Sequence, residues 1–250
     1  MRDRLLLAVL LLCFALPVQA LTTPASVEEA RVAYEAGDYV AAIDGYEAAI
    51  NAGADHALVH YNLGNAYFKS GNLGEAIASY VRAQRLAPRD GRIRANLEVA
   101  RAQIRDRELA GGVPSALMPL SWLYHAMSLN EWWTLVAVAF VVVVLASIAR
   151  QWVAGLQMAG RRVMVIVGVI GAIALVMGSA RYRVEVATPA AVVIQEEIEV
   201  RSGPGRDYNL AFRVHEGLQV DVAERRGDWW RIDLGGELVG WVPARALEAI

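Results

Sequence analysis

Cysteine and charged residues are scarce in this 250-residue chain, and each shortage narrows what the protein can be. The single cysteine, Cys13, lies in a segment that we expect to be removed, so we predict neither a disulfide nor a cysteine–metal site. Charged residues make up 20% of the chain against 56% hydrophobic residues, an excess too large for an ordinary soluble protein. The formal net charge of −2 gives no reason to expect a nucleic-acid partner.

The motifs on which most enzymes depend are also missing from the sequence. No nucleophile elbow, Walker motif or dinucleotide fingerprint occurs, and residues 203–205 are not a phosphate loop because no Gly-Lys-Ser/Thr follows them. The histidines have no metal-ligand spacing to another ligand. They are His56, His60, His125 and His215. We therefore predict a protein that is not an enzyme and that holds no metal and no cofactor.

The hydrophobic excess is concentrated in three places, of which the first is residues 1–20. Arg2 and Arg4 form a positive start, residues 5–16 are apolar but too short to span a membrane comfortably, and small residues follow Pro17. This order predicts a secretory signal peptide over residues 1–20. An uncleaved anchor is the alternative, and either one sends the following residues out of the cytoplasm.

The other two places, residues 132–149 and 163–180, are runs of equal length without a charge. At about 1.5 Å per residue, each run as a helix nearly crosses a hydrocarbon core of about 30 Å, so we predict two transmembrane helices. The connector 150–162 contains three arginines and no acid, which favours the cytoplasm. The signal peptide agrees. We therefore expect a multi-pass protein of the bacterial cytoplasmic (inner) membrane, with both large flanking segments on the periplasmic side.

The second predicted span is rich in small residues. Gly168 with Ala172, and Ala174 with Gly178, make small-xxx-small pairs. Such pairs let helices approach closely inside a bilayer. They fit tight packing against the first span and they also fit dimerisation, and the sequence leaves both open.

Comparison of the chain with itself at an offset of 34 residues reveals a repeat. Its best unit covers residues 57–90, in which Leu63 and Tyr67 face inward from one helix and Gly64 lets the partner helix approach. The turn, the inward stripe of the second helix and its stop follow at Gly71, Ala76, Tyr80, Ala83 and Pro88.

This pattern resembles the tetratricopeptide repeat. The resemblance implies an all-α domain of stacked helix pairs over residues 23–107, with residues 23–56 as a degenerate first unit and residues 91–107 as a closing helix. His60 departs from the family, which usually has tryptophan there. Two units and a cap are fewer than the roughly three repeats that such stacks need, so we expect neighbouring chains or the membrane to complete the stack.

By register with that family, polar residues of two helices line the concave face. They are Asn62, Asn65, Lys69, Arg92 and Asn96. Asparagine side chains can hold a peptide backbone and the two basic groups suit a carboxylate, so the resemblance implies a peptide-binding groove. The alternative is that Asn62 and Asn96 only satisfy local backbone or exposed turns.

The pattern changes in the second half of the chain. Residues 108–131 are glycine-containing and then largely apolar, and we predict a linker that lies in the outer membrane interface. Residues 184–250 show apolar residues with period two, for example in 218–222, and Gly235-Gly236 supplies a hairpin turn. Several short strands with glycine turns predict a small all-β barrel.

This last segment resembles a bacterial SH3 domain. The resemblance depends on the order of four segments, which are 200–204, Gly217, 228–230 and 240–242. It implies an SH3-like barrel in which Trp229 and Trp241 are candidate ligand platforms. Tryptophans in so small a barrel also serve as core residues, and both interpretations stay open.

The complete order of parts, from signal peptide through tetratricopeptide units and two spans to an SH3-like barrel, resembles the BatE-type repeat proteins of bacterial aerotolerance (Bat) operons. The resemblance implies protein partners with von Willebrand factor A domains in the same membrane, and a MoxR-type ATPase in the cytoplasm. We predict a non-catalytic scaffold whose groove holds a partner segment. The alternative, which depends on the SH3-like domain alone, is a receptor for cell-wall (peptidoglycan) ligands.

Overall fold

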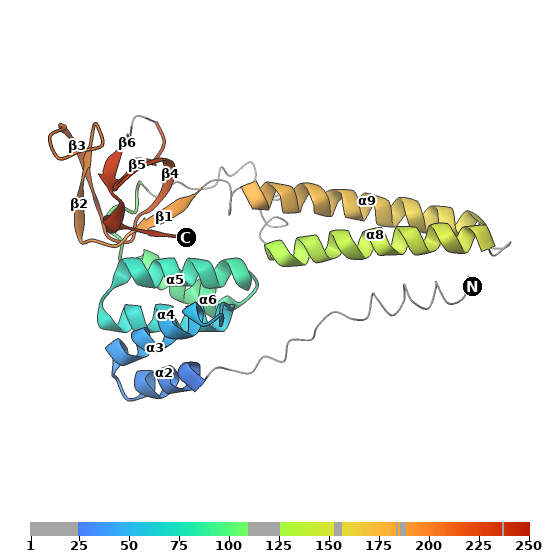
Figure 1. Ribbon diagram of the computed structural model, residues 1–250, viewed down its shortest axis with the longest axis horizontal. Helices are drawn as coiled ribbons and strands as arrows, with labels where there is room; N and C mark the ends of the chain where they lie inside the picture. The colour runs from blue at the N-terminus through green and yellow to red at the C-terminus, as the bar shows by residue number, and fades with distance from the viewer. Residues whose placement is uncertain (1–24, 110–125, 153–156, 184, 186–188, 237) are drawn as a thin grey trace.

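The computed structural model describes residues 25–109, 126–152, 157–183, 185, 189–236 and 238–250. The predicted signal peptide and most of the predicted linker lie outside the described residues. Figure 1 shows three parts, which are a stack of short helices, a long helical hairpin and a β-region. The stack and the β-region lie together at one end of the hairpin. This combination of helical repeats, two apolar helices and a small all-β region confirms the predicted fold class.

The helices of the stack follow one another with short turns. They are α2 (Ala25–Glu35), α3 (Tyr39–Asn51), α4 (Ala57–Ser70), α5 (Leu73–Leu86) and α6 (Gly91–Arg101). Asp38 caps α3 by accepting a hydrogen bond from the Ala41 N–H, and Gly71 ends α4 in the left-handed conformation that glycine adopts without strain. α5 ends at Leu86, two residues before Pro88, which has no N–H to continue a helix.

The helices pack as the repeat pattern predicts. Leu63, Ala76, Tyr80 and Ala83 are all buried. A Cβ atom added to Gly64 would lie 2.7 Å from the ring of Tyr80, so only glycine allows the two helices of this unit to approach as they do. The residues that recur with the 34-residue period are therefore residues that make buried contacts between helices.

The closing helix is shorter than predicted. α6 ends at Arg101, and residues 102–109 continue as turns. Ile104 in this segment is buried against Gly217 of the β-region. Asp106 accepts a hydrogen bond from the His215 backbone N–H at 2.6 Å. The end of the repeat domain thus serves as a contact surface rather than as a continued helix.

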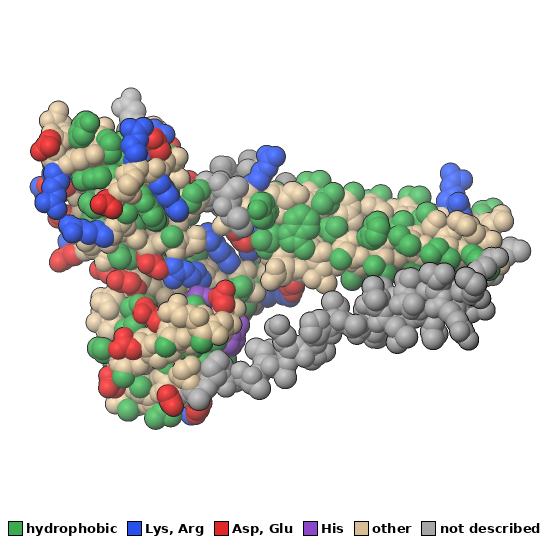
Figure 2. All heavy atoms as spheres, viewed as in Figure 1, with side chains coloured by type: hydrophobic (Ala, Val, Ile, Leu, Met, Phe, Trp, Pro, Cys, Tyr) green, Lys and Arg blue, Asp and Glu red, His purple; other side chains and the backbone are tan. Residues whose placement is uncertain are grey.

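Two long helices, α8 (Leu129–Trp152) and α9 (Gln157–Tyr182), lie side by side as a hairpin (Figure 1). Both are long and apolar enough to cross a membrane. Most of their side chains are exposed, as in helices that face lipid rather than a protein core. Basic side chains mark the end of the hairpin that is farthest from the other two parts (Figure 2).

One of the two small-residue pairs lies at the contact between these helices. Ala174 is fully buried, and a Cβ atom on Gly178 would lie 3.3 Å from the Cβ atom of Trp132 in α8. A Cβ atom on Gly168 would meet open space, and Ala172 is exposed. The pair Ala174–Gly178 therefore packs against the first helix of the same chain, whereas the other pair does not.

The β-region is one seven-stranded antiparallel sheet with the order β3-β2-β6-β5-β4-β1-β7. Its elements are β1 (Ala190–Val193), β2 (Glu197–Arg201), β3 (Leu210–His215), β4 (Gln219–Arg226), β5 (Trp229–Asp233), β6 (Val239–Pro243), the 3₁₀-helix η3 (Ala244–Ala246) and β7 (Leu247–Ala249). Val220 and Val222 alternate inward along β4, as the period-two pattern predicts. Gly235 and Gly236 both have positive φ in the β5–β6 turn, which confirms the predicted hairpin.

The β-region packs directly on the repeats, a contact that the sequence analysis did not anticipate. α5 contacts β1 and β7. Val192 of β1 is fully buried in one cluster with Ile77 and other residues of the repeats. Glu216 accepts a hydrogen bond of 2.8 Å from the Gly74 N–H in the first turn of α5, where the helix dipole favours a carboxylate. The chain's own β-region thus covers the end of the stack, a role that we expected neighbouring chains or the membrane to fill.

Candidate functional site

A hollow of about 310 Å³, which we call the groove hollow, opens between helices α2, α4, α5 and α6. It brings together three of the five residues predicted for the peptide-binding groove, which are Asn65, Lys69 and Asn96. The remaining lining is largely aromatic. It consists of Tyr34, Tyr61, Phe68, Tyr80 and Val99.

Hydrogen bonds fix the two asparagines in the hollow. The Oδ1 atom of Asn65 accepts from the Tyr80 hydroxyl and from Nδ2 of Asn96, both at 2.8 Å. Nδ2 of Asn96 also lies 3.2 Å from the hydroxyl of Tyr61. Burial raises the pKa of Tyr80, against the opposing effect of Asn96, so the Tyr80 hydroxyl stays a donor at neutral pH. Lys69 is exposed and has no ion pair within the part of the chain that the structure describes.

The other two predicted groove residues lie outside this network. Asn62 lies beside Tyr46, where it opposes the effect of burial, which raises the pKa of that tyrosine. Arg92 pairs with Asp90 at 2.7 Å and lowers the pKa of that carboxyl to about 2. The Arg92 guanidinium also lies 5.7 Å from the ring centroid of Tyr61, so it stands at the rim of the groove hollow.

Sequence reasoning missed the aromatic residues of the groove hollow. Tyr61, Asn65 and Phe68 share one face of α4, because they are four and three residues apart. That spacing was the signal that could have found them. The hollow therefore offers ring faces for apolar side chains as well as amides for a peptide backbone.

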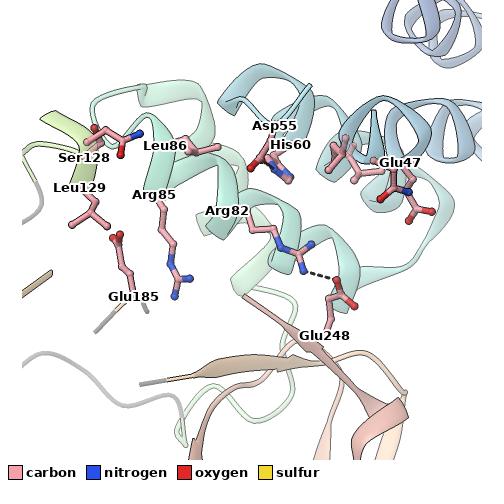
Figure 3. A pocket seen from close by; sticks show the side chains of 14 residues that line it. Glu47, Asp55, His60, Arg82, Arg85, Leu86, Ser128, Leu129, Glu185 and Glu248 are labelled. Atoms are coloured by element: carbon pink, nitrogen blue, oxygen red, sulfur yellow. Dashed lines mark hydrogen bonds and ion pairs between the residues drawn. The ribbon is translucent and has the colours of Figure 1, made fainter. Parts of the chain in front are cut away.

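A larger pocket, of about 730 Å³, lies where the repeats, the start of α8 and the β-region meet (Figure 3). Three of its charged groups, Arg82, Glu248 and Glu185, have ion-pair partners. Figure 3 shows Arg82 of α5 reaching across to Glu248 of β7. Glu185 accepts a hydrogen bond of 2.6 Å from Nε of Arg181. We therefore regard this pocket as the joint between the three parts rather than as a ligand site.

His60 lies in the wall of that joint, at the position where the repeat family usually has tryptophan. It is only 5% exposed, and its Nε2 atom lies 2.7 Å from Oδ1 of Asp55. Burial lowers the pKa of His60, although Asp55 opposes the shift. Among the described residues, no group of three or more His, Cys, Asp or Glu side chains could hold a metal ion.

The strand register separates the two predicted tryptophan platforms. Trp241 of β6 is only 7% exposed, and the Arg226 guanidinium lies 5.3 Å from its ring centroid. Trp229, at the start of β5, is half-buried and lines a hollow of about 470 Å³, which we call the Trp229 hollow. The other lining residues are Arg206, Asp228, Pro243, Ala244 and Arg245.

Comparison with known proteins identifies two of the three parts. Residues 57–90 match the family "Tetratricopeptide repeat", residues 30–71 match "TPR repeat", and residues 196–248 match "Bacterial SH3 domain". The chain is also 40% identical over 52 residues to "Putative N-acetylmuramoyl-L-alanine amidase YrvJ" of Bacillus subtilis (strain 168). That match covers 21% of this chain and only 10% of the relative. The chain therefore contains tetratricopeptide repeats and a bacterial SH3 domain, which confirms both resemblances.

Proposed function

We propose that the protein is a non-catalytic, membrane-anchored scaffold that holds a segment of a partner protein in the groove hollow. The observation that carries the proposal is the set of amide, aromatic and basic side chains that the repeats bring to one hollow. The amides can hold the backbone of an extended segment, the rings can contact its apolar side chains, and Lys69 can bind a carboxylate.

The contact between the repeats and the β-region supports placing both on the same side of the membrane. α5 packs on β1 and β7, and a hairpin of two spans returns the chain to the side that it left. Together with the predicted signal peptide and the arginine-bearing connector, this contact favours an inner-membrane protein with both domains in the periplasm. The order of parts favours a Bat-type envelope complex, with von Willebrand factor A-domain membrane proteins as the partners.

Photo-crosslinking in intact cells tests the scaffold function. A photo-crosslinking amino acid replaces Val99, which lines the groove hollow and is 54% exposed. We expect it to capture a partner, and we expect Lys69→Glu to lower the yield roughly tenfold because the substitution reverses an unpaired charge without touching the core.

The matched control position is Glu98, the exposed neighbour of Val99 that does not line the hollow. Equal capture of the same partner from Glu98, or capture from Val99 that is insensitive to Lys69→Glu, contradicts the groove as the binding site.

A second candidate function, a peptidoglycan receptor, rests on the β-region. The bacterial SH3 match favours it, as does similarity to a relative whose name refers to the N-acetylmuramoyl-L-alanine linkage that joins sugar to peptide in cell walls. Co-sedimentation of the purified full chain with peptidoglycan sacculi tests it, with Trp229→Ala as the variant expected to bind less. Absence of co-sedimentation removes the receptor function and leaves the scaffold function standing.

A further inference from the structure

The Trp229 hollow is built from three segments that the backbone holds in place. Two of them meet in the sheet, because Trp229 pairs with Pro243 and the Ala244 N–H donates to the Asp228 carbonyl at 2.8 Å. Arg245 follows in the 3₁₀-helix η3. One wall of the hollow is therefore as rigid as the β5–β6 hairpin itself.

The third segment is the loop between β2 and β3, which carries Arg206. The Arg201 guanidinium donates to the backbone oxygens of Arg206 and Tyr208, both at 2.8 Å. The ring of Tyr208 lies so close to Gly203 that no Cβ atom fits there. The loop is therefore folded around its own side chains before any ligand arrives, which lowers the entropic cost of binding.

The two arginines of this hollow differ from the other arginines of the β-region. Arg213 pairs with Glu197 at 3.2 Å, Arg226 pairs with Glu224 at 2.7 Å, and the Arg225 guanidinium covers the ring of Trp230 at 4.3 Å. Arg201 and Arg231 also have carboxylate partners.

By contrast, the side chains of Arg206, Arg245 and Asp228 have no hydrogen bond or ion pair within the part of the chain that the structure describes. Two unpaired guanidinium groups and one unpaired carboxylate thus surround the half-buried indole ring of Trp229.

We propose that the Trp229 hollow binds the zwitterionic head of an amino acid within a short cell-wall peptide. The two guanidinium groups suit a carboxylate, Asp228 suits an ammonium group, and the indole face suits the carbon chain between them. A protein C-terminus offers a carboxylate without a neighbouring ammonium group and so leaves Asp228 unpaired.

A diamino dicarboxylic acid residue fits instead, because one of its ends keeps both groups free when the other is in peptide linkage. This inference rests on the proposed receptor function and specifies its ligand.

Three small molecules with the same linear carbon backbone separate the contribution of the carboxylates from that of the ammonium groups. The probes are meso-diaminopimelate, pimelate, which lacks the amines, and 1,5-diaminopentane, which lacks the carboxylates. Isothermal titration calorimetry measures their binding to the full chain in lipid nanodiscs. We expect meso-diaminopimelate to bind roughly tenfold or more tightly than either of the others, because each of them leaves charged groups of the hollow unpaired.

Substitutions of exposed residues test the assignment without disturbing the fold. We expect Arg245→Gln to weaken meso-diaminopimelate and pimelate roughly tenfold, and Asp228→Asn to weaken meso-diaminopimelate and diaminopentane but not pimelate. Arg213→Gln, which removes a paired arginine of the same domain, is the matched control and leaves all three affinities unchanged. Equal binding of meso-diaminopimelate and pimelate, or wild-type affinity in Arg245→Gln and Asp228→Asn, overturns the proposal.

Co-sedimentation with sacculi distinguishes failure of the zwitterion site from failure of the proposed receptor function. Sacculi that bind a chain with no affinity for meso-diaminopimelate leave the receptor function intact and refute the zwitterion site. A chain that binds meso-diaminopimelate but no sacculi keeps the zwitterion site and loses the receptor function.

Discussion

Gly74, in the first turn of α5, is the position where the packing of the β-region on the repeats can be tested most sharply. Alanine in a helix is ordinarily about 0.8–1.0 kcal/mol more favourable than glycine, so Gly74→Ala should stabilise a free repeat stack. In the folded chain, however, the added Cβ atom would lie 2.8 Å from the Cα atom of Ile194 and closer still to the carbonyl oxygen of Val193. Both are backbone atoms, which cannot move aside as the end of a side chain can.

Two costs follow if the β-region shifts to relieve this overlap. Overpacking at a close contact costs about 1–3 kcal/mol. The hydrogen bond from the Gly74 N–H to the Glu216 carboxylate, which is 2.8 Å long, is stretched or lost, at about 1.5–3 kcal/mol for a charged acceptor. After the gain in helix propensity, we expect Gly74→Ala to weaken the contact by about 1.5–5 kcal/mol.

Hydrogen–deuterium exchange of the full chain in nanodiscs measures this effect locally. We expect amides of residues 190–193 and 214–220 to exchange roughly 10- to 5,000-fold faster in Gly74→Ala, because their opening becomes easier by that free energy. Gly91→Ala is the matched control, since Gly91 also begins a helix of the stack and its Cβ atom would meet only the tip of Arg94, at 4.0 Å. If Gly74→Ala exchanges at these amides as Gly91→Ala does, the described packing of β1 against α5 is incorrect.

Three further predictions concern the repeats and the hairpin. Gly64→Ala places a methyl group 2.7 Å from the Tyr80 ring and should lower the stability of the repeats by about 1–3 kcal/mol in thermal unfolding; an unchanged midpoint contradicts the described contact. Burial lowers the pKa of His60 below its ordinary 6.5, so the unfolded chain binds a proton at His60 at a higher pH than the folded chain does, and stability is lost as the pH falls below about 6.5. The unfolding midpoint of His60→Gln should therefore fall less than that of the wild type between pH 7 and 5. Parallel pH profiles of the two proteins contradict this effect of His60. Gly178→Leu should separate α8 from α9 in spin-label distance measurements, whereas Gly168→Leu, at a position with open space, should not, and equal effects contradict the helix contact.

Local patterns predicted the parts of this protein well. The 34-residue offset finds the pair Tyr46 and Tyr80 because repeated units place the same residue types at the same buried contacts. Gly235-Gly236 predicts the β5–β6 hairpin because positive φ at both positions favours glycine. Uncharged runs predict the two long helices because a helix among lipids needs no polar face.

The relations between parts could not be predicted in the same way. Gly74 belongs to no motif in the sequence and Gly217 is only a landmark of the SH3 resemblance, although each makes room for the other domain. Trp229 and Trp241 also look alike in the sequence, because each belongs to a predicted strand. Only the register of β5 and β6 decides that Trp241 is buried and that Trp229 lines a hollow. Such contacts join surfaces that no periodicity in the sequence connects.

The burial of Val192 in the core of the repeats has a consequence for how the protein is made. The α5 surface that includes Ile77 stays uncovered until α8 and α9 have been synthesised and β1 has followed them. Under the proposed topology, a molecule in which α9 does not return the chain across the membrane leaves β1 on the opposite side from α5, and an apolar surface of its repeats stays exposed to proteases. Under the proposed topology, only molecules with both domains on one side of the membrane bury that surface.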